Sequence, residues 1–84
     1  MTRTAKLYSW ILANKDASIP FRDFERLLKA FGFVCARISG SHRIYEHPTA
    51  SRALSIQPRG KDAKSYQIRQ FVTIVEEFGL TMDE

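Results

Sequence analysis

A change of hydrophobic period at Gly32 constrains the fold of this chain more strongly than any other feature of its sequence. On the N-terminal side, apolar side chains recur every three or four residues, which predicts an amphipathic helix that begins at Pro20 and ends at the glycine. On the C-terminal side, short apolar runs alternate with turn residues, as in β-strands. The chain therefore combines helices with a sheet. The helical stripe consists of Phe21, Phe24, Leu27, Leu28 and Phe31.

Three short strands are predicted after this helix, at residues 33–38, 42–47 and 52–57. The turns "SGS" and "PTAS" join them. Pro58 ends the third strand, because proline cannot donate to a ladder. Short connections of this kind favour an antiparallel meander with one apolar face.

The alternation within each strand predicts which side chains face the core. In the third strand, Leu54 and Ile56 share the apolar face. In the middle strand, we expect Arg43, Tyr45 and His47 on the opposite, open face of the sheet. That face and the turns beside it would be available to a ligand.

Two further helices complete the pattern. Leu7, Trp10 and Ile11 predict a short helix over about residues 4–14, with these side chains directed into the core. A longer stripe from residue 65 predicts a last helix that ends at Gly79. Helices with apolar stripes must cover one face of the sheet, which gives an α+β fold of order α–α–β–β–β–α. The last stripe consists of Ile68, Phe71, Val72, Val75 and Phe78.

Length and composition indicate one small globular domain, since the 84 residues are 44% hydrophobic and 26% charged. We expect a helical extension at residues 1–17, a core at 18–80 and an acidic tail at 81–84. The apolar runs are too short for a membrane span, and the basic first residues lack the apolar run of a secretory signal. The single cysteine, Cys35, favours the cytoplasm and is expected as a small buried hydrophobe.

Charge is distributed unevenly along the chain, whose net charge is +4. Residues 33–69 carry seven Lys and Arg against two acids, whereas the last fifteen residues carry four acids and no basic residue. A basic centre suits a polyanion such as nucleic acid, although a solubilising surface would have the same composition.

The segment before the last helix carries a candidate phosphate site. Arg59, Lys61 and Lys64 precede or open that helix, so their charges add to the partial positive charge of its N-terminus. Tyr45 and Tyr66 are candidates for stacking on bases, although a tyrosine half-buried against a strand is the commoner outcome.

His42 is the candidate catalytic residue. It follows Gly40 and Ser41, a turn that lets the backbone approach a ligand closely, and an imidazole acts as an acid or a base near neutral pH. On the motif alone, a solvated loop residue is the more frequent outcome. His47 lies five residues further on, so in a regular strand it falls on the opposite face, roughly 16 Å away. This spacing argues against an acid–base pair or a shared zinc site, and we expect His47 at the surface.

Three segments in order resemble the HicA family of toxins from bacterial type II toxin–antitoxin modules. They are "FERLLKAFGF", "GSHRIYEHP" and "LSIQPRGKDAKSYQIRQFVTIVEEFGL". The resemblance covers about residues 21–80 and continues in a helical N-terminal extension that one branch of the family carries. It implies a fold like the double-stranded-RNA-binding domain.

The resemblance also implies a function and a site. It implies a ribosome-independent mRNA endonuclease that stops translation and is held inactive by a HicB-type antitoxin. The family's catalytic histidine falls on His42. A second histidine that many members carry after the third strand is not matched, because this chain has Pro58, Arg59 and Gly60 there.

We therefore expect metal-independent RNA cleavage, without a cofactor and without a membrane partner. His42 would take the proton from a ribose 2′-hydroxyl, and basic and turn residues would hold the phosphate. Two alternatives stay open at this point: an RNA-binding module without catalysis, and a protein-interaction domain that docks through its N-terminal helix. The expected phosphate-binding residues are Gly40, Ser41, Arg43, Arg59, Lys61 and Lys64.

Overall fold

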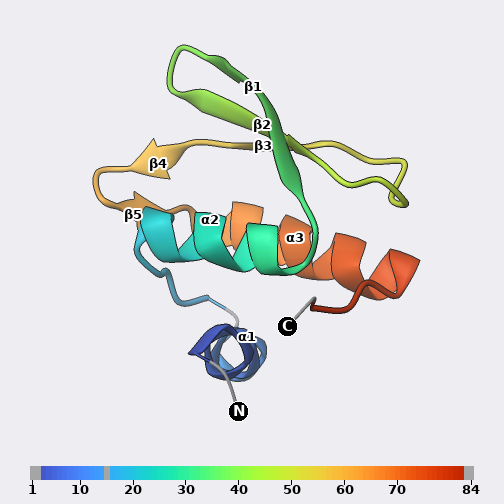
Figure 1. Ribbon diagram of the computed structural model, residues 1–84. Helices are drawn as coiled ribbons and strands as arrows, with labels where there is room; N and C mark the ends of the chain where they lie inside the picture. The colour runs from blue at the N-terminus through green and yellow to red at the C-terminus, as the bar shows by residue number, and fades with distance from the viewer. Residues whose placement is uncertain (1–2, 15, 83–84) are drawn as a thin grey trace.

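The computed structural model describes residues 3–14 and 16–82; parts of the expected extension and acidic tail, residues 1–2, 15 and 83–84, lie outside the described residues. Three layers follow one another: a sheet, then a pair of helices, then the N-terminal helix (Figure 1). This arrangement confirms the predicted α+β class with helices on one face of the sheet. The elements are α1 (Arg3–Ala13), α2 (Phe21–Ala30), β1 (Val34–Ser39), β2 (His42–Glu46), β3 (Leu54–Ile56), β4 (Pro58–Arg59), β5 (Asp62–Ala63) and α3 (Ser65–Phe78).

The two central helices form where the apolar stripes predicted them. In α2, the stripe is buried against α3 and the sheet, and Phe24 and Leu27 have no exposed surface. Gly32 follows with a φ of +93°, a conformation that glycine adopts at little cost. At the end of α3, Gly79 is left-handed and the next amide, of Leu80, donates to the Val75 carbonyl oxygen at 3.0 Å.

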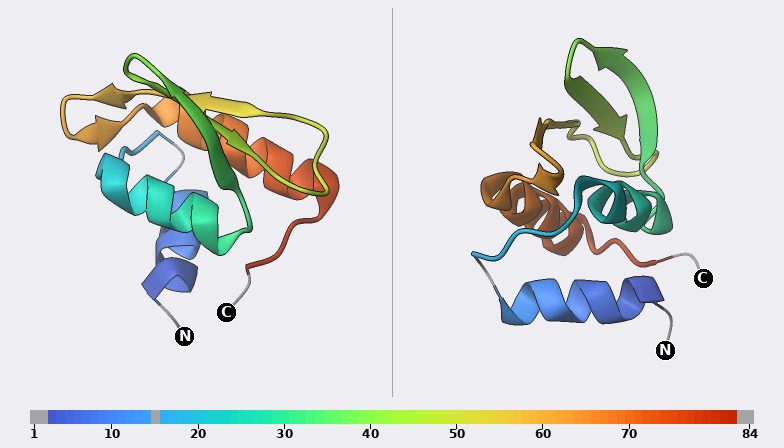
Figure 2. Two further views of the ribbon diagram at one scale, coloured as in Figure 1. Left: turned by 45° about the horizontal axis from the view of Figure 1, so that its top comes forward. Right: turned by 90° about the vertical axis from the view of Figure 1, so that its left-hand side faces the viewer.

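The three longer strands form the predicted antiparallel meander, in the order β1–β2–β3. The β1–β2 hairpin stands above the helices and projects beyond them (Figure 2). Its tip is therefore covered on neither side by a helix, and Ile38 is 63% exposed.

The expected orientation of β2 is wrong. Tyr45 lies opposite Leu54, and Arg43 lies opposite Ile56, so all four side chains share the helix-covered face. Tyr45 is only 1% exposed. The prediction failed because a tyrosine ring is apolar even though its hydroxyl is polar, and a buried ring needs only one partner for that hydroxyl.

The basic segment after β3 is a hairpin and not the plain loop that its composition predicted. β4 and β5 pair around Gly60, which has a φ of +64°. Two backbone bonds of 2.8 Å join this hairpin to the start of α2: Phe21 N–H donates to the Lys61 carbonyl oxygen, and Ala63 N–H donates to that of Ile19. The hairpin and both central helices therefore begin at the same end of the molecule (Figure 1).

Helix α1 packs beneath the pair of central helices. Its Tyr8 ring contacts the rings of Phe31 and Phe71, with centroids 4.9 and 6.0 Å apart, and Ile11 is buried. The expectation that Trp10 belongs to the core is wrong, since its side chain is 45% exposed. An outermost helix is covered on one side only, and Trp10 lies at the margin of that side. No helix in the described part of the chain has the length and apolarity needed to cross a membrane.

Candidate active site

His42 opens β2 directly after the turn formed by Gly40 and Ser41. Gly40 has a φ of +60°, which explains the glycine at this corner. The His42 imidazole is exposed and forms no hydrogen bond or ion pair with any residue in 3–14 or 16–82. It borders a hollow of about 380 Å³ between the sheet and α3. The other polar residues that line this hollow are Arg52, Ser55, Tyr66, Gln67 and Gln70.

The side chain of Gln57 connects the turn before His42 to the start of α3. Its Nε2 donates to Ser41 Oγ at 2.9 Å, and its Oε1 accepts from Lys64 Nζ at 3.3 Å. The ammonium group of Lys64 is thereby held on the same side of the molecule as the His42 turn. A cation and a base near one exposed corner form an arrangement that suits an anionic ligand.

Gln67 supports this connection from inside the molecule. It is 3% exposed, its Oε1 accepts from Gln57 N–H at 3.1 Å, and its Nε2 donates to the Tyr66 hydroxyl at 3.3 Å. Sequence reasoning missed both glutamines. The available signal was a polar residue one helical turn before Phe71, within an apolar stripe, which predicts a buried amide with bonded partners.

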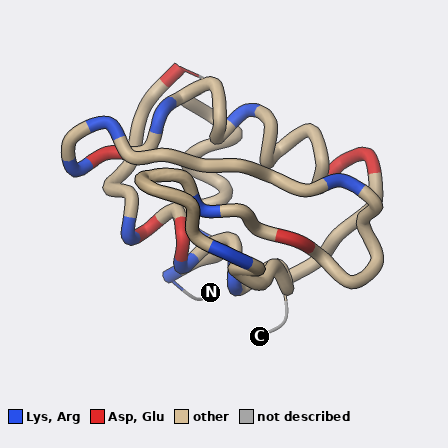
Figure 3. Tube along the Cα trace, turned by 90° about the horizontal axis from the view of Figure 1, so that it is seen from above, with Lys and Arg blue, Asp and Glu red and all other residues tan. Residues whose placement is uncertain are grey.

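The remaining predicted cations divide between two further hollows. Arg59 and Lys64 line one at the start of α3, together with Ser65, Tyr66 and the acidic Asp16 and Asp62. Lys61 lies in another, of about 930 Å³, beside α2. Lys and Arg nevertheless gather toward the end of the molecule that carries the β4–β5 turn (Figure 3). The structure thus brings Ser41, Lys64 and, next to it, Arg59 to the His42 side, and it places Lys61 apart from them.

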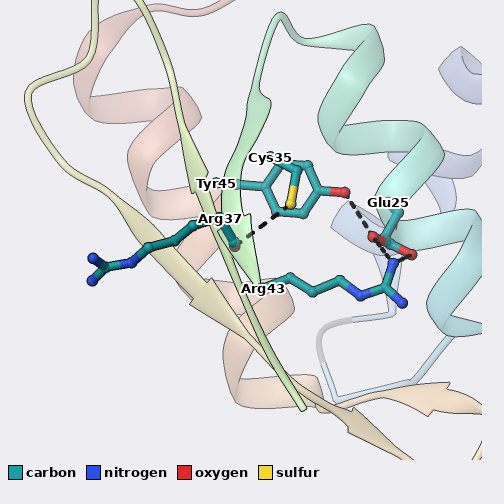
Figure 4. A network of polar contacts seen from close by, with 5 residues as sticks. All are labelled: Glu25, Cys35, Arg37, Arg43 and Tyr45. Carbon is teal, nitrogen blue, oxygen red and sulfur yellow. Dashed lines mark hydrogen bonds and ion pairs between the residues drawn. The ribbon is translucent and has the colours of Figure 1, made fainter. Parts of the chain in front are cut away.

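Arg43 is engaged on the opposite face of β2 (Figure 4). Its guanidinium donates to both carboxylate oxygens of Glu25, at 2.9 and 2.7 Å, and lies 5.5 Å from the centre of the Phe21 ring. Tyr45 donates its hydroxyl to Glu25 Oε2 at 2.7 Å. The expectation that Arg43 and Tyr45 lie on an open face is therefore corrected: both face α2, and Glu25 satisfies both.

These contacts change the acid–base behaviour of the cluster. Burial raises the pKa of the Tyr45 phenol, and the hydrogen bond to Glu25 and the negative charge of that carboxylate raise it further. The hydrogen bond that Arg43 donates to Glu25, followed by the charge of that carboxylate, raises the pKa of the Arg43 guanidinium. Cys35 lies beside this cluster, half-buried, with Sγ 3.7 Å from the Arg37 carbonyl oxygen.

His47 is a structural residue and not the free surface residue that its place at a strand end suggested. Its Nδ1 accepts the Thr49 backbone N–H at 3.1 Å, and its Nε2 lies 2.8 Å from the Phe31 carbonyl oxygen. Because a carbonyl only accepts, Nε2 carries the proton and donates. The ring also meets the edge of Phe33, at 5.1 Å between centroids. His47 lies against the C-terminal end of α2, so the expectation that it lies on the open face of the sheet is wrong.

The described residues contain no group of three or more His, Cys, Asp or Glu side chains arranged to hold a metal ion. What they do bring together is one unpaired imidazole, a lysine held near it, a glycine corner and the start of a helix. This arrangement can bind a phosphate and exchange a proton with a group beside it.

Comparison with known proteins gives a family match. No curated protein and no solved structure gives a significant match to the chain. A family model described as the HicA toxin of bacterial toxin–antitoxin modules matches residues 21–80, from the first residue of α2 to just beyond α3. The match spans the sheet, both central helices and the His42 corner. The chain therefore belongs to the HicA family, the toxins of bacterial toxin–antitoxin systems.

Proposed function

We propose that this toxin is an endoribonuclease that cleaves mRNA in the cytoplasm without a metal ion and so inhibits translation. The observation that carries the proposal is the position of the His42 imidazole. It is exposed and unpaired within the described residues, and the hydrogen bonds of Gln57 tie the adjacent Ser41 to Lys64. A base beside a fixed cation is what cleavage of a phosphodiester by its own 2′-hydroxyl requires.

In the proposed reaction, His42 accepts the proton of a ribose 2′-hydroxyl. The resulting oxygen attacks the adjacent phosphorus, the bond to the 5′-oxygen of the next nucleotide breaks, and a 2′,3′-cyclic phosphate forms. Water protonates the departing 5′-oxygen. The ammonium of Lys64 and the exposed backbone of Gly40 and Ser41 stabilise the charge that develops on the phosphoryl oxygens.

The other cations act further from the reacting phosphate in this proposal. Arg59, which lines the same hollow as Lys64, holds a neighbouring phosphate. Lys61, in its separate hollow, contacts RNA beyond that point. Arg43 contributes positive potential but no direct contact, since its guanidinium is bound to Glu25.

A cleavage assay with a synthetic RNA tests the proposal. His42→Ala should lower the rate by about 10²- to 10⁴-fold, the effect of removing a general base. A substrate with a single 2′-deoxynucleotide at the cleaved position should stay intact there, and EDTA should leave the wild-type rate unchanged. Cleavage by His42→Ala at the wild-type rate, or loss of cleavage in EDTA, would contradict the proposal. RNA that is bound but stays intact would instead identify a non-catalytic RNA-binding module.

The same surface is the proposed contact for a HicB-type antitoxin. Acidic or groove-filling residues of the antitoxin would cover the corner of His42 and Lys64 and so exclude RNA. With the His42→Ala protein, the antitoxin should displace a labelled RNA. A stable complex that holds antitoxin and RNA together would rule out simple occlusion. In cells, the toxin alone should arrest growth, and His42→Ala should not.

A further inference from the structure

Tyr66 stands between the two hollows at the start of α3. It lines the hollow of His42 on one side and the hollow of Arg59 and Lys64 on the other. Its side chain is 48% exposed, although it is a large aromatic group in the first turn of a helix. The exposed ring therefore lies between His42, the proposed catalytic base, and Arg59 and Lys64, the cations proposed to bind phosphate.

One hydrogen bond, from Gln67, restrains the ring. Gln67 Nε2 donates to its hydroxyl at 3.3 Å, and Gln67 itself is buried and bonded through Oε1 to the backbone of Gln57. A fixed aromatic face loses little conformational freedom when a planar ligand stacks on it, which favours binding.

The hollow on the His42 side offers polar groups in addition to this ring. Ser55 and Gln70 line it, and the Gln70 side chain forms no hydrogen bond within residues 3–14 and 16–82. Its amide combines donors and an acceptor, the combination that pairs with the edge of a nucleobase. Arg52, which also lines this hollow, forms an ion pair with Glu77 at 2.7 Å.

We propose that Tyr66 is a base-binding residue of the toxin: an unpaired RNA base stacks on its ring, with its edge toward Gln70, while the sugar and phosphate of the same strand lie at His42. This proposal rests on the proposed function. Stacking on Tyr66 would also favour unpaired RNA over duplex RNA, because a base inside a duplex has both faces covered by its neighbours. The toxin should therefore prefer unpaired RNA, although its fold resembles a domain that binds duplexes.

Binding measurements in the His42→Ala protein test this proposal without cleavage. The probe is a labelled RNA of roughly 12 nucleotides, offered either alone or annealed to its complement. Tyr66→Leu should weaken binding of the unpaired RNA about tenfold, the effect of losing one base–aromatic stack. Trp10→Leu is the matched control, since Trp10 is similarly exposed but lies on α1; it should bind within about twofold of the parent.

Two further arms complete the experiment. Tyr66→Phe keeps the ring and should retain unpaired-RNA binding within about threefold, even if the loss of the Gln67 bond lowers its stability. The parent should bind the annealed RNA more weakly than the unpaired RNA, and Tyr66→Leu should remove most of that preference. Unchanged binding by Tyr66→Leu, or an equal loss for both RNA forms, would overturn the proposal. Because no arm measures cleavage, these outcomes are independent of whether His42 is catalytic.

Discussion

The two faces of strand β2 carry polar side chains in opposite conditions. Toward α2, Arg43 and Tyr45 are both bonded to Glu25, and all described buried polar side-chain atoms have partners. On the other face, which the described helices do not cover, His42 has no partner within the described residues and borders an open hollow. Adjacent residues of one strand thus differ. Arg43 belongs to a cluster whose polar groups are hydrogen-bonded to one another, the saturated side. His42 belongs to an exposed turn and is unpaired within the described residues, the unsaturated corner.

This contrast separates stability from chemistry. A polar group whose hydrogen-bonding capacity is satisfied inside the protein stabilises the fold and is unavailable to a ligand. A group left unpaired at the surface contributes little to stability and can bind or react. Changes on the α2 side should therefore lower the free energy of unfolding, and changes at the corner should alter RNA binding at nearly constant stability.

The largest expected effect is on the saturated side. Glu25→Ala leaves the Tyr45 hydroxyl and the Arg43 guanidinium without their shared partner, which should lower the free energy of unfolding by about 2–4 kcal/mol. Urea unfolding measures this change. Glu46→Ala is the control, since Glu46 is exposed on the other face of β2; its effect should stay within about 0.5 kcal/mol. Equal effects of the two substitutions would remove the contrast between the faces.

A smaller loss of stability is expected for a substitution at Gly32, which lies beside the His47 ring. A Cβ atom at residue 32 would lie 3.0 Å from His47 Nε2, in a backbone with a φ of +93°. Gly32→Ala should therefore destabilise the fold by about 2 kcal/mol, from backbone strain and from displacement of the ring. At Gly79, also left-handed, a Cβ meets nothing within 4 Å, so Gly79→Ala should cost about 1 kcal/mol from strain alone. The difference in thermal stability between the two variants measures the contribution of the His47 contact. A loss of stability for Gly79→Ala as large as that for Gly32→Ala would argue against this contribution.

At the unsaturated corner, Lys64→Met should weaken RNA binding by the His42→Ala protein about tenfold, the effect of removing one charged hydrogen bond. Lys61→Met removes the same charge from the separate hollow and should weaken binding about threefold or less. Both variants should unfold at the parent's urea concentration. A larger loss of RNA binding for Lys61→Met than for Lys64→Met would indicate that the RNA phosphates bind away from His42.

The smallest effect concerns alkaline pH. The pKa of Tyr45 is raised in the folded protein, so above about pH 10 the unfolded chain loses a proton that the folded protein retains. Stability should therefore fall as pH rises through this window. Near pH 10.5 the contribution of one tyrosine is under about 1 kcal/mol. Tyr45→Phe should show a correspondingly shallower fall between pH 9 and pH 10.5. Parallel curves for the two proteins would show that Tyr45 is not the group responsible.

Local patterns predicted most of the architecture. The stripe from Phe21 to Phe31, the turns between strands and the glycine at residue 79 each act within a few residues, and α2, α3 and the three-stranded meander formed where they indicated. The exposed corner at His42 was also predicted, because a glycine–serine turn is itself a local feature.

Contacts between distant segments could not be predicted in this way. Gln57 and Gln67 bond to each other only because β3 and α3 lie side by side, and the β4–β5 hairpin depends on Ile19 and Phe21. The orientation of β2 was mispredicted because the pairing of Tyr45 with Glu25 joins residues twenty positions apart. The sequence pattern indicates that a side chain is polar, but it does not indicate which distant group forms a hydrogen bond with it.

The buried amide at position 67 also explains why a charged isostere would be unsuitable there. A glutamate could still accept the Gln57 amide proton, and it could accept the Tyr66 hydroxyl proton in place of the donation that Gln67 makes. Its negative charge, however, would lie in the lining of the His42 hollow and would oppose an incoming nucleotide. The neutral side chain at residue 67 therefore favours binding of a polyanion in this hollow.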